Sequence, residues 1–215
     1  MVWQREKSEL MEKCIASWRK YCPDWEIIEW NEDNFDVNFC PYAAKAYREK
    51  RYGFLPDAAR VKIIYEHGGV YLDTDVELIH SLDELLDYPA WFGYGTHTGV
   101  NPGSGFGAEK NNLFIKKLLE HYEAYDDSAK FEVCTKTDTG VFVKELTGFK
   151  PDHNVQQEFR DVVVINNIWK YVIHHYTGTW MTPWQRFETK VAGALPTGIR
   201  SFLIDIRRKA KNIMK

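Results

Sequence analysis

Several features of exported and membrane-bound proteins are missing from this sequence of 215 residues. No stretch approaches the roughly 18 consecutive apolar residues that a membrane-spanning helix needs, and residues 1–7 contain no apolar core of a signal peptide. The four cysteines have neither a C-x-x-C pairing nor zinc-site spacing: Cys14, Cys22, Cys40 and Cys134. We therefore expect buried, reduced thiols in a cytoplasmic protein that neither is secreted nor spans a membrane.

The surplus of positive charge that nucleic-acid binding requires is also missing. The chain has 28 Lys and Arg against 31 Asp and Glu, a net charge of −3. Residues 184–215 hold eight basic and two acidic side chains, which leaves 20 basic and 29 acidic ones, a net charge of −9, in residues 1–183. A region this acidic lacks the basic surface that neutralises the phosphates of a nucleic acid. We therefore expect no nucleic-acid partner.

Aromatic side chains are abundant, at 15% of the chain, and hydrophobic residues make up 44%, enough to bury a core. No internal repeat is visible, and apolar residues at helical spacing alternate with short strand-like runs. Helices are expected over residues 6–21, 42–50, 58–67, 111–123 and 139–147, and strands over 25–30, 70–78, 91–94, 162–165 and 170–174. This alternation predicts an α/β fold with a mostly parallel sheet.

Acidic side chains gather in the predicted strand 70–78. Because side chains alternate along a strand, three acidic side chains would share one face with a tyrosine: Asp73, Asp75 and Glu77 with Tyr71. Two adjacent carboxylates repel each other unless a cation neutralises them. Oxygen ligands favour Mg²⁺ or Mn²⁺, which keep positions open for phosphate oxygens. The pattern predicts a metal–diphosphate site, with a solvated strand end as the structural alternative.

Three kinds of protein use acidic residues at this spacing. An EF-hand loop would require glycine where Leu78 stands, which excludes it. A haloacid-dehalogenase-type phosphatase fits residues 72–76, but that fold usually opens with this strand, whereas about seventy patterned residues precede it here. The third is a glycosyltransferase D-x-D motif, in which a metal joins the aspartates to the diphosphate of a nucleotide sugar.

The residues around the motif resemble glycosyltransferase family 32. The runs Phe54–Arg60 (FLPDAAR) and Gly68–Asp75 (GGVYLDTD) are similar to that family's sugar-binding region. The resemblance covers about residues 10 to 182, with further similar runs at Lys13–Asp24, Glu109–Asn112 and His174–Trp180. The family includes bacterial capsular and exopolysaccharide transferases, and is related to the yeast initiating mannosyltransferase and, more distantly, to clostridial glucosylating toxins.

The resemblance implies a GT-A-like fold over residues 1–182, followed by a basic tail at 183–215. It implies metal-dependent transfer, with retention, of a hexose or N-acetylhexosamine from a nucleotide diphosphate, UDP rather than GDP. A glycan or a lipid-linked oligosaccharide would be the acceptor. We see no candidate nucleophile in the sequence, which favours attack by the acceptor on the same face of the sugar.

The resemblance also assigns residues to the donor. Asp57 and Arg60 would hydrogen-bond the hydroxyls of the donor sugar, and their spacing of three places both on one helical turn. Asp57 also stands where a helix N-cap belongs, and a surface ion pair is the structural alternative for Arg60. Tyr71 and Trp180 would complete the contacts with the donor.

Mn²⁺ or Mg²⁺ would be the cofactor. Asp73 would contact the metal or the ribose, Asp75 would bind the metal directly, and a histidine would complete the shell. Only one of His174 and His175 can face the site if they lie on a strand, and His175 is the predicted ligand. With Asp57 and Arg60, the two aspartates form the predicted catalytic set. The glycine-rich run 99–107 would line the acceptor side, or be a surface loop.

Two features leave alternatives open. Relatives begin with a strand that builds the nucleotide-base pocket, and we expect that first strand to be missing here. A sugar-nucleotide-binding pseudo-transferase is therefore an alternative to an active enzyme. In the tail, one helical face is apolar: Ile199, Phe202, Leu203, Ile206, Ala210 and Ile213. Such a basic amphipathic helix would lie on the inner face of the cytoplasmic membrane, or pack on the acidic body.

Overall fold

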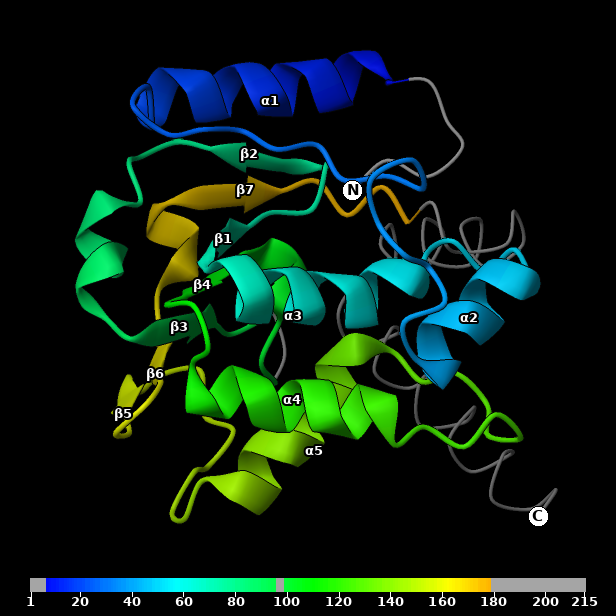
Figure 1. Ribbon diagram of the computed structural model, residues 1–215. Helices are drawn as coiled ribbons and strands as arrows, with labels where there is room; N and C mark the ends of the chain where they lie inside the picture. Colours follow the sequence, from blue (N-terminus) through cyan, green and yellow to red (C-terminus); the bar gives the residue numbers. More distant parts are fainter. Residues whose placement is uncertain (1–6, 96–98, 179–215) are drawn as a thin grey trace, which may run out of the picture. The chain divides into compact units, whose positions relative to one another are not determined.

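A mixed five-stranded sheet forms the centre of the computed structural model, which describes residues 7–95 and 99–178 (Figure 1). In spatial order its strands are β1 (Gly69–Tyr71), β4 (Phe106–Ala108), β3 (Ala90–Gly93), β6 (Val163–Ile165) and β5 (Gln157–Glu158). β3 and β6 are parallel, and the other three neighbouring pairs are antiparallel. The predicted α/β fold with a mixed sheet is confirmed. Its parallel share is smaller than expected, because β4 returns antiparallel beside β3 instead of crossing over.

Four helices form the layer packed on and beside this sheet: α2 (Pro41–Arg48), α3 (Leu55–His67), α4 (Leu113–Glu123) and α5 (Cys134–Glu145). Much of the aromatic content lies between these helices and the strands. The ring of Phe92 on β3 stacks on that of Phe106 at 4.7 Å between centroids, and Phe114 meets Phe142 edge-on at 4.4 Å. The aromatic abundance therefore builds the core.

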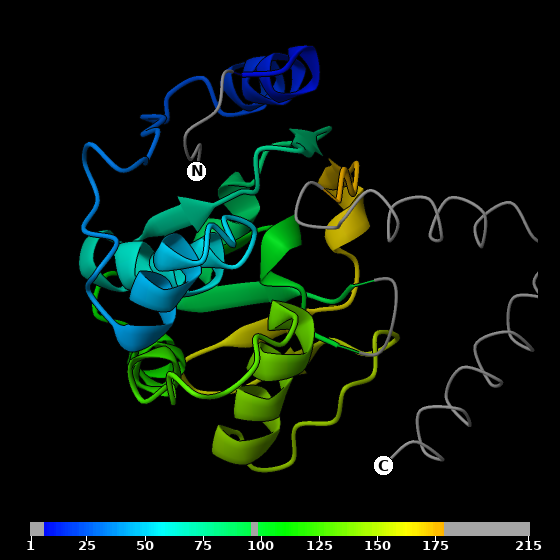
Figure 2. The same cartoon turned by 90° about the vertical axis from the view of Figure 1, so that its right-hand side faces the viewer.

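A second, two-stranded sheet carries the first helix. β2 (Val76–Leu78) pairs antiparallel with β7 (Val172–His174), and α1 (Glu9–Tyr21) packs on β2. Ser17 Oγ accepts a hydrogen bond from the amide of Leu78 at 2.8 Å, and the indole of Trp18 donates to the carbonyl of Val76 at 2.7 Å. Figure 2 shows α1 with these strands at one end of the unit and α4 and α5 at the other. No helix in the described ranges is long and apolar enough to cross a bilayer.

The predicted strand 70–78 is wrong as a single element. It is two strands in different sheets, β1 and β2, separated by a turn at residues 72–75. The amide of Val76 donates to the carbonyl of Asp73 at 3.0 Å and closes that turn. Because the alternation is interrupted, Glu77 does not continue the face of Asp73 and Asp75. The two aspartates project from a turn.

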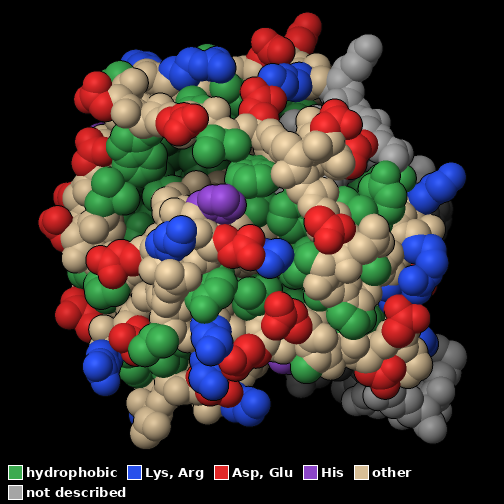
Figure 3. Space-filling view, in the orientation of Figure 1, with side chains coloured by type: hydrophobic (Ala, Val, Ile, Leu, Met, Phe, Trp, Pro, Cys, Tyr) green, Lys and Arg blue, Asp and Glu red, His purple; other side chains and the backbone are tan. Residues whose placement is uncertain are grey.

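The predicted strand 25–30 is also wrong. Residues 26–30 have no regular secondary structure, because no described strand pairs with their backbone. They line one wall of an apolar hollow of about 300 Å³, and β1 and the end of α3 line the other. Figure 3 shows a hollow lined with hydrophobic side chains on this face. The absence of a first strand stays a prediction.

Candidate functional site

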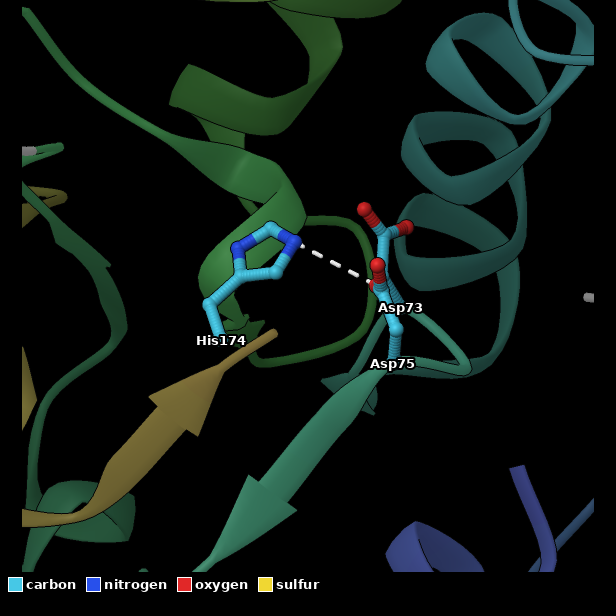
Figure 4. A group of neighbouring side chains, drawn as sticks. All are labelled: Asp73, Asp75 and His174. Carbon is cyan, nitrogen blue, oxygen red and sulfur yellow. Dashed lines mark ion pairs between the residues drawn. The ribbon is translucent and has the colours of Figure 1, made fainter. Parts of the chain in front are cut away.

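Three potential metal ligands meet where the turn between β1 and β2 approaches the end of β7. One ligand atom each from Asp73, Asp75 and His174 lies within 4.8 Å of the others. Figure 4 shows the imidazole of His174 pointing at the two carboxylates. Its Nε2 lies 3.3 Å from Asp75 Oδ1. We refer to these three residues as the metal-ligand cluster.

Neighbouring donors hold one oxygen of each carboxylate. Asp73 Oδ1 accepts a hydrogen bond from the Tyr71 hydroxyl at 2.6 Å and lies 3.6 Å from Arg60 Nη1. Asp75 Oδ2 accepts from both the amide and the hydroxyl of Thr177, at 2.9 and 2.7 Å. The second oxygens, Asp73 Oδ2 and Asp75 Oδ1, receive no hydrogen bond from these donors, and we therefore assign them to the metal.

The charge on Asp75 suits a cation ligand. Its partial burial raises the pKa, but hydrogen bonds from His174 and Thr177 outweigh burial and lower the pKa from 3.8 to about 2. The group is therefore a carboxylate throughout the neutral range, and metal ligands have to be deprotonated.

The donor set fits the predicted metal. Two carboxylates suit Mg²⁺ and Mn²⁺ alike, and an imidazole nitrogen adds a preference for Mn²⁺. The backbone of Gly103 passes close to two of the three residues of the metal-ligand cluster. A Cβ built at Gly103 would lie only 2.6 Å from Asp73 Oδ2 and 3.5 Å from His174 Cε1. The chain thus leaves the free face of the cluster clear of side-chain atoms at this position.

His174 takes the place predicted for His175. The side chain of His175 points elsewhere, and its Nε2 lies 2.9 Å from Glu77 Oε2, which also receives Lys13 Nζ at 2.7 Å. The physical reason is strand alternation: His174 is the last residue of β7, opposite Val76, and the next residue faces the other side. The alternation of side chains along a strand shows that only one of the two histidines can face the site, but it does not show which one.

Asp57 and Arg60 form a buried ion pair. Arg60 is 1% exposed and Asp57 5%, and the guanidinium donates directly to Asp57 Oδ1. Asp57 Oδ2 accepts from the hydroxyl of Tyr42 at 3.3 Å. Since α3 begins at Leu55, Asp57 lies within its first turn and is not the N-cap. A surface ion pair is excluded, and Arg60 connects this pair to Asp73.

Sequence reasoning missed a further buried acid beside this pair. Asp138 on α5 is fully buried, and its Oδ1 accepts a hydrogen bond from the Tyr122 hydroxyl at 2.7 Å. Its Oδ2 and the Nε of Arg60 have no hydrogen-bond partner among the described residues. A single aspartate at mid-helix gives no local signal of such a role, because helical polar residues usually face solvent.

The remaining donor-binding predictions have different outcomes. Tyr71 is largely buried. Its hydroxyl donates a hydrogen bond to Asp73, and its ring centroid lies 5.5 Å from the guanidinium carbon of Arg60, so Tyr71 holds Asp73 and Arg60 in position. Trp180 lies outside the described residues, as does the basic tail at 183–215. The glycine-rich run 99–107 is partly β4, and its residues 101–104 lie against the metal-ligand cluster.

Comparison with known proteins finds similarity in the same region. Residues 8–91 match the model described as "Glycosyltransferase sugar-binding region containing DXD motif". Inositol phosphoceramide mannosyltransferase 3 of Schizosaccharomyces pombe is 28% identical over 136 residues, which cover 60% of this chain and 38% of that protein. No solved structure matches the chain.

Two proteins of Saccharomyces cerevisiae are also similar. Mannosyl phosphorylinositol ceramide synthase SUR1 is 27% identical over 135 residues, 58% of this chain and 35% of that protein. The synthase CSH1 is 31% identical over 107 residues, 47% of this chain and 28% of that protein. The chain thus spans little more than a third of these relatives at most. Residues 8–91 are similar to the DXD-containing sugar-binding region of glycosyltransferases, and Asp73-Thr74-Asp75 has the form of that DXD motif.

Proposed function

We propose that this protein is a metal-dependent, retaining glycosyltransferase that moves a hexose or N-acetylhexosamine from a nucleotide diphosphate to a glycan or lipid-linked acceptor. One observation carries the proposal. The turn between β1 and β2 brings two carboxylates to His174, while Arg60 links Asp73 to the buried Asp57. Cation ligands thus lie beside a fixed guanidinium, as binding of a sugar diphosphate requires.

Asp73, Asp75 and His174 would hold Mn²⁺ or Mg²⁺. When bound, such an ion neutralises the diphosphate and stabilises the charge of the departing nucleotide. Tyr71 and Thr177 would keep the carboxylates in place, since each donates to the oxygen that faces away from the metal position. The side chains would therefore need little rearrangement when the ion binds.

Arg60 and Asp57 would bind the donor sugar. Their mutual ion pair fixes both groups within one turn of α3, so neither loses much conformational freedom on binding. Arg60 lies 3.6 Å from Asp73, so we expect its charge to lie next to the predicted diphosphate. Contact of Trp180 with the donor stays a prediction.

Retention would follow from attack on the same face as the leaving group. A covalent intermediate requires a free carboxylate beside the anomeric carbon. Asp73 and Asp75 belong to the metal-ligand cluster, and Asp57 is paired with Arg60. Asp138 has one oxygen without a partner among the described residues but is fully buried. We therefore favour an acceptor hydroxyl as the nucleophile.

The acceptor proposal rests on the relatives. Their names assign them the mannosylation of inositol phosphoceramide, a lipid with a phosphoinositol head group. This supports mannose as the sugar and a lipid-linked acceptor, ahead of a capsular or exopolysaccharide glycan. UDP as the nucleotide, a cytoplasmic location and membrane contact through the tail stay predictions.

The test is release of nucleoside diphosphate by the purified full-length chain, incubated with UDP- and GDP-sugars and Mn²⁺. We expect release that EDTA abolishes and that adding a phosphoinositol lipid accelerates. Release of inorganic phosphate from phosphomonoesters would instead support the phosphatase, and donor binding without release would support the pseudo-transferase.

The adjacent histidines supply a matched pair of variants. His174→Ala should abolish most of the Mn²⁺-dependent release, because its imidazole belongs to the metal-ligand cluster. His175→Ala should leave release near the wild-type level, because its imidazole contacts Glu77 outside the cluster. Equal losses in both variants would contradict the assignment of His174.

A further inference from the structure

The turn at Pro102–Ser104 brings a second set of polar groups to the metal-ligand cluster. Ser104 is fully buried, and its Oγ lies 3.0 Å from Nδ1 of His174. The side-chain amide of Asn101, also buried, donates to the same Oγ at 2.7 Å. Neither residue belongs to the DXD motif or to the donor-binding pair.

The two nitrogens of His174 therefore face different partners. Nε2 points at Asp75 Oδ1, 3.3 Å away, and Nδ1 points at Ser104 Oγ. A metal binds the nitrogen lone pair, so Nε2 can serve as a ligand only when the ring proton is on Nδ1. Ser104 Oγ can accept that Nδ1–H bond, because a hydroxyl has two acceptor sites and Asn101 uses one of them.

The ring of His174 is also restrained from its face. It stacks on the ring of Tyr176 at 4.0 Å between centroids, with an interplanar angle of 13°. Stacking sets the plane of the imidazole but does not select which nitrogen carries the proton. That selection falls to the hydrogen-bond partners of the two nitrogens.

We propose that Ser104 is a positioning residue: held by Asn101, it orients His174 and accepts the Nδ1–H hydrogen bond when Nε2 binds the metal. The inference rests on the proposed metal-dependent function. It also explains the small residue before Ser104, because any Cβ at Gly103 would lie 2.6 Å from Asp73 Oδ2 and push this turn away from the cluster.

The first test measures Mn²⁺ affinity of the full-length protein by electron paramagnetic resonance of free Mn²⁺. Ser104→Ala should raise the Kd about tenfold, the usual cost of removing the hydrogen-bond partner of a metal-bound histidine. In a His174→Ala background, Ser104→Ala should have no further effect, because Ser104 acts through that ring. Unchanged affinity in the single variant, or additive losses in the double variant, would overturn the proposal.

A matched control separates this role from loss of a buried hydroxyl in general. Ser17 is also buried, with its Oγ bonded to the carbonyl of Cys14 and the amide of Leu78, away from His174. Ser17→Ala should bind Mn²⁺ like the wild type. A loss equal to that of Ser104→Ala would assign both effects to the fold.

A second measurement needs no metal. The ¹⁵N chemical shifts of the His174 ring report which nitrogen carries the proton, and Ser104→Ala should change them, whereas Ser17→Ala should not. If the wild type binds no Mn²⁺, the proposed function fails, and these shifts alone decide whether Ser104 positions the ring. Identical His174 shifts in wild type and Ser104→Ala would overturn the inference.

Discussion

Two neighbouring groups of charged side chains contain aspartates whose pKa values are shifted in opposite directions. The metal-ligand cluster is Asp73, Asp75 and His174; the second group, which we call the buried charge cluster, is Asp57, Arg60 and Asp138. Arg60 Nη1 joins the two at 3.6 Å from Asp73 Oδ1. Burial raises the pKa of Asp57 to about 7 and of Asp138 to about 6, whereas the pKa of Asp75 falls to about 2.

The difference follows from the balance between burial and donors. Asp57 is buried more deeply than Asp75. The pKa of Asp57 is raised although its carboxylate receives hydrogen bonds from Arg60 and Tyr42.

Asp75 faces the imidazole of His174 and receives two hydrogen bonds from Thr177, which more than offset its desolvation. Asp138 receives one hydrogen bond, from Tyr122, and its second oxygen has no partner among the described residues. Hydrogen-bond donors therefore lower the pKa of a buried carboxylate only where they outweigh the cost of its desolvation.

The largest effect is expected from Asp75→Asn, which removes one of the two carboxylates of the metal-ligand cluster. Mn²⁺ binding should be lost, and Mn²⁺-dependent release of nucleoside diphosphate should fall by on the order of 10³-fold, as for other losses of transition-state charge stabilisation. Glu77→Gln, two residues further on, is the control, because its carboxylate pairs with Lys13 and His175. Release that stays Mn²⁺-dependent in Asp75→Asn would contradict the assignment.

Removing the charge of Arg60 should affect folding more than any surface change. Arg60→Met leaves Asp57 buried without its cation, which should lower the free energy of unfolding by about 3–5 kcal/mol in urea titrations. Arg48→Met is the matched control, because its ion pair with Asp127 is exposed and should contribute less than about 1 kcal/mol. Equal losses in the two variants would show that burial of the pair does not matter.

The buried charge cluster should also make stability depend on pH. The raised pKa of Asp138 means that the folded state holds this proton more tightly than the unfolded state, where the pKa is 3.8. Its contribution is therefore fully present below pH 3.8 and is lost as the pH rises through about 6, a change of about 2–3 kcal/mol. The groups that act on it are Arg60, whose charge lowers the pKa, and Tyr122, whose hydroxyl donates to it.

The variant Asp138→Asn directly tests the contribution of Asp138 to the pH dependence of stability. The free energy of unfolding of wild type, relative to the variant, should decrease between pH 4 and pH 6.5, because the asparagine cannot titrate. Urea titrations at four or five pH values measure the slope. Parallel pH profiles for the two proteins would mean that Asp138 is ionised in the folded state throughout.

The smallest effect concerns two glycines. Gly103→Ala should weaken Mn²⁺ binding about tenfold, because the new Cβ would lie 2.6 Å from Asp73 Oδ2 and displace a ligand or its supporting turn. Gly140→Ala in α5 meets nothing within 4 Å and should leave binding unchanged while raising stability by up to about 1 kcal/mol. Comparable binding losses in both would contradict a specific role of Gly103.

Sequence reasoning found the helices because apolar spacing and breakers are local signals. The predicted helix at 111–123 is α4, capped by the side chain of Asn112, and the one at 6–21 is α1, capped by Ser8. The errors of the sequence-based prediction concern strands. The segment 25–30 has strand-like composition but no described partner, and a strand exists only when another backbone satisfies its hydrogen bonds. The break within 70–78 likewise depends on β7, about a hundred residues away.

The sequence by itself determined the chemistry: a D-x-D pair, a histidine pair and an Asp–Arg spacing of three, each a set of residue types that short-range order can specify. Only the tertiary structure decided how these groups are used. It selected His174 over His175, buried Arg60, brought Asp138 beside it, and placed Ser104 behind the imidazole. The physical reason is that burial and hydrogen-bond partners come from segments distant in the chain, and no local pattern encodes which of them will meet.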